Sequence, residues 1–153
     1  MNRLVVPNGI LLPEVERLLA QGNDVVLMTK GSSMLPFITG DRDSVLLRRR
    51  ESIEKGEIVL ARLSAKRYVL HRIWEIEGDK VTLMGDGNIR GKENCGTADI
   101  CGTAVQILKE DGRCVDTLSP SSRRKAKLWR ALLPIRRYLL AIYRRLPNKR
   151  NKI

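Results

Sequence analysis

A hydroxyl-rich corner between two apolar runs is the part of this 153-residue sequence best suited to covalent chemistry. Ser32 and Ser33 stand in the stretch Lys30–Asp41, with a glycine before them and a proline after them, and apolar runs at 25–28 and 44–47 flank it. This pattern predicts two strands joined by a tight corner. A serine exposed there, with free backbone N–H groups beside it, has the geometry of a nucleophile and its oxyanion donors. An ordinary serine-rich turn fits the same residues.

Two segments further along the chain could belong to the same site. His71 is the only histidine and lies in the alternating, strand-like segment Tyr68–Ile73. Next comes Leu83–Asn88, which reads as the end of a strand running into the turn Gly85-Asp86-Gly87-Asn88. A lone histidine on an apolar strand is more often a core residue with satisfied hydrogen bonds than a base, so its position alone assigns no role.

Together, the three segments resemble the S24/S26 clan of serine peptidases, which contains signal peptidases and self-cleaving repressors of the SOS type. The resemblance covers roughly residues 25–106 and rests on short blocks that are specific only in combination. These blocks are Ser33-Met34-Leu35-Pro36 followed by Gly40-Asp41, Lys55-Gly56-Glu57-Ile58-Val59, His71-Arg72-Ile73 and Gly85-Asp86-Gly87-Asn88.

The resemblance implies a catalytic pair of Ser33 and His71. Most of the clan uses a lysine as general base, but the matching position here is His71, as in archaeal and eukaryotic-type signal peptidases. Histidine titrates near neutrality without a large pKa shift. Such a base usually needs an acid that fixes its tautomer. Asp86 and Glu93 are equal candidates for this acid, and Asp99 is the third.

The same resemblance implies roles for the neighbours of the nucleophile. The main-chain N–H groups of Ser32 and Ser33 would hold the oxyanion. Met34 and Pro36 would shape the elbow and the substrate cleft. Ser32 as the nucleophile is a lesser alternative, because the family pattern places methionine directly after the catalytic serine.

The rest of the chain predicts a mainly β fold. Short apolar runs separated by turn residues indicate an all-β barrel or folded sheet, and the resemblance implies a folded β-barrel like that of signal peptidases and repressor C-terminal domains. A short helix over 12–21 precedes the sheet, with Pro13 in its first turn. The expected strands cover 25–29, 44–48, 57–63, 67–76, 80–84 and 100–108.

Charge divides the chain into a body, residues 1–116, and a basic tail, residues 117–153. The body has 17 basic and 17 acidic residues, whereas the tail has 12 basic residues and no acid, so the tail carries the whole net charge of +12. Apolar residues recur in the tail at helical spacing, and Pro134 should divide it into two helices. A basic amphipathic helix over 123–146 predicts an interfacial anchor on anionic lipid. Binding to nucleic acid or to a protein, and packing on the body, are the alternatives for this tail.

The cysteines and the N-terminal segment indicate in which cellular compartment the protein is expected. Three cysteines without Cys-x-x-Cys spacing, in a chain with one histidine, predict free thiols and neither a zinc site nor another cofactor. The N-terminal segment is too short and interrupted for a signal peptide or a spanning helix. We therefore expect a cytoplasmic protein, with the tail as its attachment to the inner face of the membrane.

These observations converge on a cytoplasmic serine endopeptidase. The resemblance implies that it cleaves a peptide or protein substrate next to small side chains, and a dedicated leader or precursor peptide fits better than secretory processing. A self-cleaving regulator of the repressor type is one alternative, although the single helix that precedes the sheet cannot supply a helix-turn-helix. A catalytically inactive, membrane-associated adaptor is the other.

Overall fold

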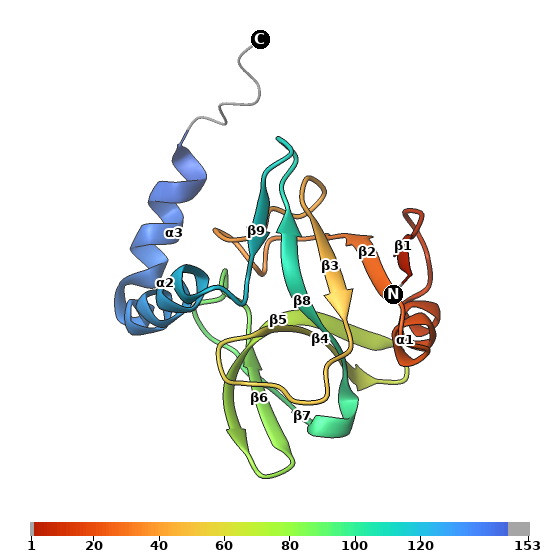
Figure 1. The fold of residues 1–153 in the computed structure, drawn as a ribbon. Helices are drawn as coiled ribbons and strands as arrows, with labels where there is room; N and C mark the ends of the chain where they lie inside the picture. Colours follow the sequence, from red (N-terminus) through yellow and green to blue (C-terminus); the bar gives the residue numbers. More distant parts are fainter. Residues whose placement is uncertain (1, 147–153) are drawn as a thin grey trace.

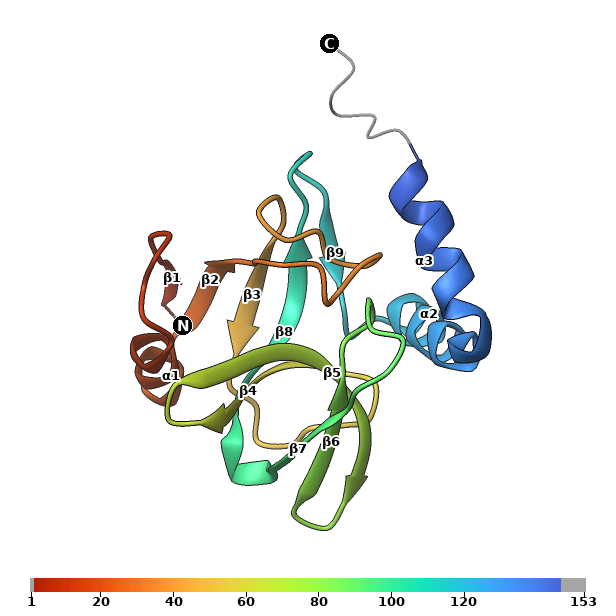
Figure 2. The ribbon, with the colours of Figure 1, turned by 180° about the vertical axis from the view of Figure 1, so that it is seen from behind.

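The computed structural model describes residues 2–146, which form a folded β-sheet with helices at opposite sides (Figures 1 and 2). Helix α1 lies at one side, and α2 and α3 lie at the other. In chain order the elements are β1 (Arg3–Val5), α1 (Leu12–Ala20), β2 (Asp24–Met28), β3 (Ser44–Arg48), β4 (Ile58–Ser64), β5 (Arg67–Glu77), β6 (Lys80–Met84), β7 (Glu93–Gly96), a 3-10 turn (Thr97–Asp99), β8 (Ile100–Leu108), β9 (Cys114–Asp116), α2 (Pro120–Ala131), a second 3-10 turn (Leu133–Ile135) and α3 (Arg136–Arg145).

The predicted mainly β fold and its flanking helices are confirmed, and the sheet is open. The strand order is β1-β2-β3-β8-β4-β5-β6-β7, and β9 pairs with β8. Strands β1 and β7 stand at the two ends of this order, so the sheet does not close into a barrel. All six predicted strands form. The three additional strands, β1, β7 and β9, are only three or four residues long, too short to show an alternating pattern.

Strand β8 joins two halves of the sheet. It pairs with β3 in one half and with β4 in the other, and both pairings are antiparallel. The register shifts between Leu46 and Leu47 on β3 and between Leu60 and Ala61 on β4. Such bulges increase the local twist, which folds the halves toward each other.

Apolar clusters hold both halves of the sheet, and one of these clusters spans the two halves. In the first half, Val15 and Leu19 stand one turn apart on α1 and are fully buried against β2, β3 and β8. In the second half, Val59, Ile73 and Leu83 pack between neighbouring strands. Strand β5, which carries the predicted base, contributes Leu70 to the first cluster and Ile73 to the second.

The tail packs on the body through two side chains of the helical segment 123–146, for which packing on the body was one of the alternatives. The indole N–H of Trp129 donates to the carbonyl oxygen of Asp86 at 2.8 Å, and its ring contacts Phe37 edge to face. Arg136 is only 2% exposed, stacks on Trp129 and donates to the carbonyl oxygen of Asn88. Pro134 does divide the tail into two helices, as predicted. Residues 147–153 of the predicted tail lie outside the described residues.

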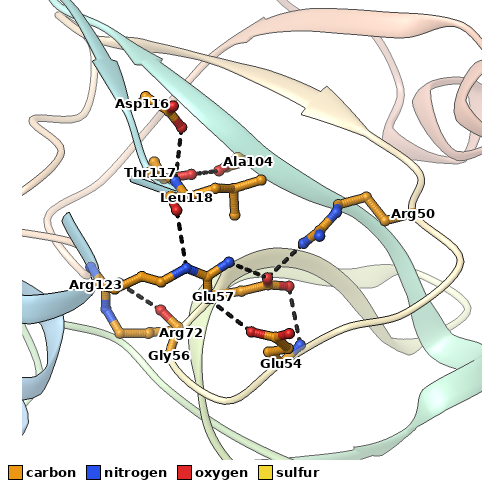
Figure 3. A network of polar contacts seen from close by, with 10 residues as sticks. All are labelled: Arg50, Glu54, Gly56, Glu57, Arg72, Ala104, Asp116, Thr117, Leu118 and Arg123. Carbon is orange, nitrogen blue, oxygen red and sulfur yellow. Dashed lines mark hydrogen bonds and ion pairs between the residues drawn. The ribbon is translucent and has the colours of Figure 1, made fainter. Parts of the chain in front are cut away.

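An ion-pair network adds a second attachment for the tail (Figure 3). The buried carboxylate of Glu57 accepts hydrogen bonds from Arg50 of the body at 2.5 Å and from Arg123 of α2 at 3.3 Å. Arg123 also reaches Glu54 at 3.1 Å and the carbonyl oxygen of Leu118 at 3.0 Å. A buried carboxylate is costly unless it is paired, so this network favours the docked position of α2.

We expect Trp129→Ala to lower the free energy of unfolding by about 3–5 kcal/mol, because it removes a buried aromatic ring and leaves the Asp86 carbonyl without its donor. Urea unfolding followed by circular dichroism measures this change. Tyr138→Ala on α3 is the matched control, since Tyr138 is exposed and should cost less than about 0.5 kcal/mol. Equal effects of the two substitutions would show that the helices do not pack as described.

Candidate active site

Ser33 lies just after β2, on a corner that the neighbouring residues fix. Gly31 has a φ of +78°, a conformation that favours glycine, and it turns the chain out of the strand. A single helical turn follows, in which the N–H groups of Phe37 and Ile38 both donate to the carbonyl oxygen of Met34 at 3.0 Å. Met34 and Ile38 are buried in the core, so the half-buried Ser33 stands at the edge of a well-anchored turn.

The Gly85–Asn88 turn presses against the backbone of the two serines. The N–H of Gly87 donates to the carbonyl oxygen of Ser33 at 2.8 Å. A β-carbon on Gly87 would lie 2.3 Å from the carbonyl oxygen of Ser32, and one on Gly85 would lie 2.4 Å from that of Ser33. Only glycine permits this approach, which explains both glycines of the Gly-Asp-Gly sequence.

His71 is buried on β5 with one ring nitrogen against a carboxylate. Its Nδ1 lies 2.5 Å from Oε1 of Glu93, which is the first residue of β7. The oxygen does not lie along the direction of an N–H bond at Nδ1, and no other acceptor among the described residues is aligned with it. Burial lowers the pKa of His71, and the negative charge of Glu93 offsets part of that effect. The imidazole therefore favours its neutral form at pH 7, with Nδ1 facing the carboxylate.

The structure brings the other two candidate acids to different partners. Asp86 forms a two-pronged ion pair with Arg72, with distances of 2.8 and 2.7 Å. Asp99 accepts a hydrogen bond from the N–H of Gly96 at 2.9 Å. Of the three acids, Glu93 alone contacts His71 within residues 2–146. Since successive residues of a strand point to opposite faces, His71 and Arg72 select different carboxylates.

A cavity of about 340 Å³ is lined by both Ser33 and His71. Its walls are largely apolar, and Met34 contributes to them, whereas Pro36 lines a separate groove. No hydrogen bond joins the Ser33 hydroxyl to His71 in the described part of the chain, and such bonds often tighten only when substrate binds. The N–H groups of Ser32 and Ser33 donate to no backbone acceptor among the described residues, so they are available to an oxyanion.

The N-terminal segment forms one wall of this cavity, which the sequence analysis missed. Residues 7–10 line it because β1 pairs in parallel with β2 and leads the chain past the corner that carries Ser33. A three-residue strand gives no periodic signal, so nothing local in the sequence could have indicated this wall.

Comparison with known proteins agrees with the geometry. A family model described as Peptidase S24-like matches residues 6–105, which include Ser33, His71 and Glu93 and end before the helices of the tail. None of the curated proteins compared with the chain matches it.

We expect Gly87→Ala to lower the free energy of unfolding by about 1–3 kcal/mol, because the added methyl group overlaps the Ser32 carbonyl oxygen. Urea unfolding measures the change. Gly96→Ala is the control, since its methyl group would meet its nearest neighbour, Asp99, at an ordinary 3.4 Å. Stability of Gly87→Ala equal to that of the control would contradict the close approach of the two turns.

Proposed function

Because the chain belongs to the Peptidase S24-like family, we propose that it is a serine endopeptidase with Ser33 as nucleophile, His71 as general base and Glu93 as the orienting acid. The observation that carries this proposal is the shared cavity, which both Ser33 and His71 line, while the Glu93 carboxylate lies against Nδ1 of the histidine. Nucleophile, base and orienting group in this order form the arrangement that activates a serine.

The proposed reaction follows from the positions of the two ring nitrogens of His71. Nδ1 faces Glu93, which leaves Nε2 to accept the proton of Ser33 as its oxygen attacks the carbonyl carbon of the peptide. The N–H groups of Ser32 and Ser33 stabilise the negative oxygen of the tetrahedral intermediate. The C–N bond then breaks, and Nε2 returns its proton to the leaving amine. Water, activated by the same histidine, hydrolyses the remaining ester and frees Ser33.

Glu93 suits the orienting role better than Asp86. The charge of Asp86 is neutralised by Arg72, which also donates to the carbonyl oxygen of Gly56 at 2.8 Å. Asp86 therefore holds the Gly85–Asn88 turn in place. Glu93, by contrast, favours the imidazolium that forms when His71 takes the proton.

The cavity also supports an extended peptide as substrate. On β2, pairing with β1 ends at Val26, and on β5, pairing with β6 begins at Arg72. Leu27 and Met28 on one side and Tyr68–Leu70 on the other thus leave a strand edge unpaired in the described structure, and all of them line the cavity. A substrate backbone can pair with such an edge while its side chains enter the apolar walls. A dedicated leader or precursor peptide fits this site.

Self-cleavage is the second candidate function, and the wall formed by residues 7–10 favours it, because it places the chain's own backbone in the cavity with Ser33. Intact-mass measurement of the purified protein after prolonged incubation tests it. Loss of an N-terminal fragment from the wild type and not from Ser33→Ala would support self-cleavage. An unchanged mass, together with cleavage of added peptides, would favour the endopeptidase.

We expect Ser33→Ala and His71→Ala each to reduce cleavage of a mixed peptide library by at least about 10³-fold, since each removes a member of the catalytic unit. Mass spectrometry identifies the products, and a fluorophosphonate probe tests labelling of Ser33 in parallel. Ser32→Ala is the matched control, because it keeps the main-chain N–H and should retain activity within several-fold. A wild type without cleavage, or a Ser33→Ala variant as active as the wild type, would overturn the assignment.

We expect Glu93→Gln to lower kcat/KM by about 10²–10⁴-fold, because the imidazolium loses its counter-charge. The acid limb of the pH–rate profile should lie below about pH 6.5 in the wild type, since burial lowers the pKa of His71. It should move to still lower pH in Glu93→Gln, because Glu93 raises that pKa.

Asp86→Asn is the comparison variant for this test. It breaks a buried ion pair with Arg72, so we expect it to lower the free energy of unfolding by about 3–5 kcal/mol and to move the acid limb less. The reverse result, a larger displacement of the limb in Asp86→Asn, would assign the orienting role to Asp86.

A further inference from the structure

Exposed apolar side chains concentrate on the helices of the tail. Of the nine large hydrophobic side chains that are exposed in residues 2–146, six lie between residues 128 and 146. The remaining three are dispersed through the body. The six on the tail are Leu128, Ile135, Tyr138, Ile142, Tyr143 and Leu146.

Three of these side chains form a continuous stripe along α3. Ile135, which directly precedes α3, is three residues from Tyr138, and Tyr138 is four residues from Ile142, so the three side chains follow one side of the helix. We call this stripe the apolar face. Arg136 and Leu140 point into the body instead, which turns the apolar face away from the sheet. In Figures 1 and 2, α3 stands to one side of the sheet. Residues 141–145 of this helix are all exposed.

Exposed cations lie on both helices that carry these apolar side chains. Residues 117–146 include nine Lys and Arg residues and no Asp or Glu. Arg123 and Arg130 pair with acids of the body, and Arg136 is buried. The other six are exposed, and none forms an ion pair within the described residues; they are Arg124, Lys125, Lys127, Arg137, Arg144 and Arg145.

We propose that α2 and α3 form a docking surface for an anionic phospholipid membrane. The apolar face enters the interfacial region, and the long, exposed cationic side chains of both helices reach for the anionic headgroups. Charge complementarity favours an anionic membrane over the other possible occupants of this surface. A second copy of the chain would bring the same cations together without any acid to compensate them, and a nucleic acid would leave the apolar face in water.

The packing of the tail gives this surface a fixed orientation. Trp129 and Arg136 lock the helices onto the Asp86 turn, and Arg123 joins them to Glu57 (Figure 3). The residues that hold the tail and the residues that would meet lipid are different, so the two roles can be separated by mutation.

Co-sedimentation with vesicles tests the proposal. We expect the full-length protein to bind vesicles of phosphatidylcholine with phosphatidylglycerol at least about tenfold more tightly than phosphatidylcholine alone, and to bind less tightly as salt is raised. The double variant Tyr138→Glu/Ile142→Glu should lose about tenfold or more. Arg137→Gln/Arg144→Gln/Arg145→Gln should remove most of the preference for the anionic vesicles.

The matched control is Val5→Glu/Leu11→Glu, which adds the same charges at exposed apolar positions of the body, 77% and 74% accessible, and should bind like the wild type. Circular dichroism and urea unfolding check that every variant is folded, as expected for exposed positions. Cleavage of soluble peptides should be the same in all of them, so a failure of lipid binding is distinguishable from a failure of the peptidase assignment.

Three results would overturn the proposal. They are absence of vesicle binding by the wild type, equal binding to neutral and anionic vesicles, and unchanged binding by Tyr138→Glu/Ile142→Glu. Light scattering of the lipid-free protein tests whether a second copy of the chain occupies the apolar face instead. A dimer that is lost in Tyr138→Glu/Ile142→Glu would assign the face to a second copy.

Discussion

The hydrogen bond from the N–H of Gly87 to the carbonyl oxygen of Ser33 is the contact on which the site depends. Ser33 follows β2 in one half of the sheet, whereas His71 and Glu93 lie on β5 and β7 in the other, and β8 is the strand that pairs with both halves. The two glycines let the backbones of the halves touch directly at the point where the chemistry is proposed. A side chain at either position would separate the serine from the histidine.

Strand β5 carries both the proposed base and the residue that fixes the turn beside Ser33. His71 and Arg72 are consecutive, so their side chains leave the strand on opposite faces and reach different acids, Glu93 and Asp86. The pair of His71 and Glu93 is not aligned as a hydrogen bond, and His71 lines the cavity, where it could exchange a proton. The pair of Arg72 and Asp86 is a two-pronged, buried ion pair that fixes the turn touching Ser33. The proposed base and the rigid support of its site are thus neighbouring residues.

The sequence predicted the long strands well, because alternation over five or more residues and the turns between them are local signals. It could not decide between Asp86 and Glu93, since that choice depends on which face of β5 each acid meets and on the register of β6 with β7. The tail shows the same limit. Trp129 fits a lipid-facing helix by composition, and only the tertiary contact with the Asp86 carbonyl shows that it is buried.

The chain has one histidine, and this limits how it can respond to acidity. Histidine is the side chain whose unperturbed pKa, about 6.5, lies nearest neutrality, and burial raises the pKa of Cys95 to about 11 and of Cys101 to about 12. Because burial lowers the pKa of His71, the unfolded chain binds more protons there than the folded chain as the pH falls through about 6.5, so the fold loses stability on acidification. The guanidinium charges of the tail stay constant over that range. Mild acidification would therefore protonate the imidazole while leaving the positive charge of the tail unchanged.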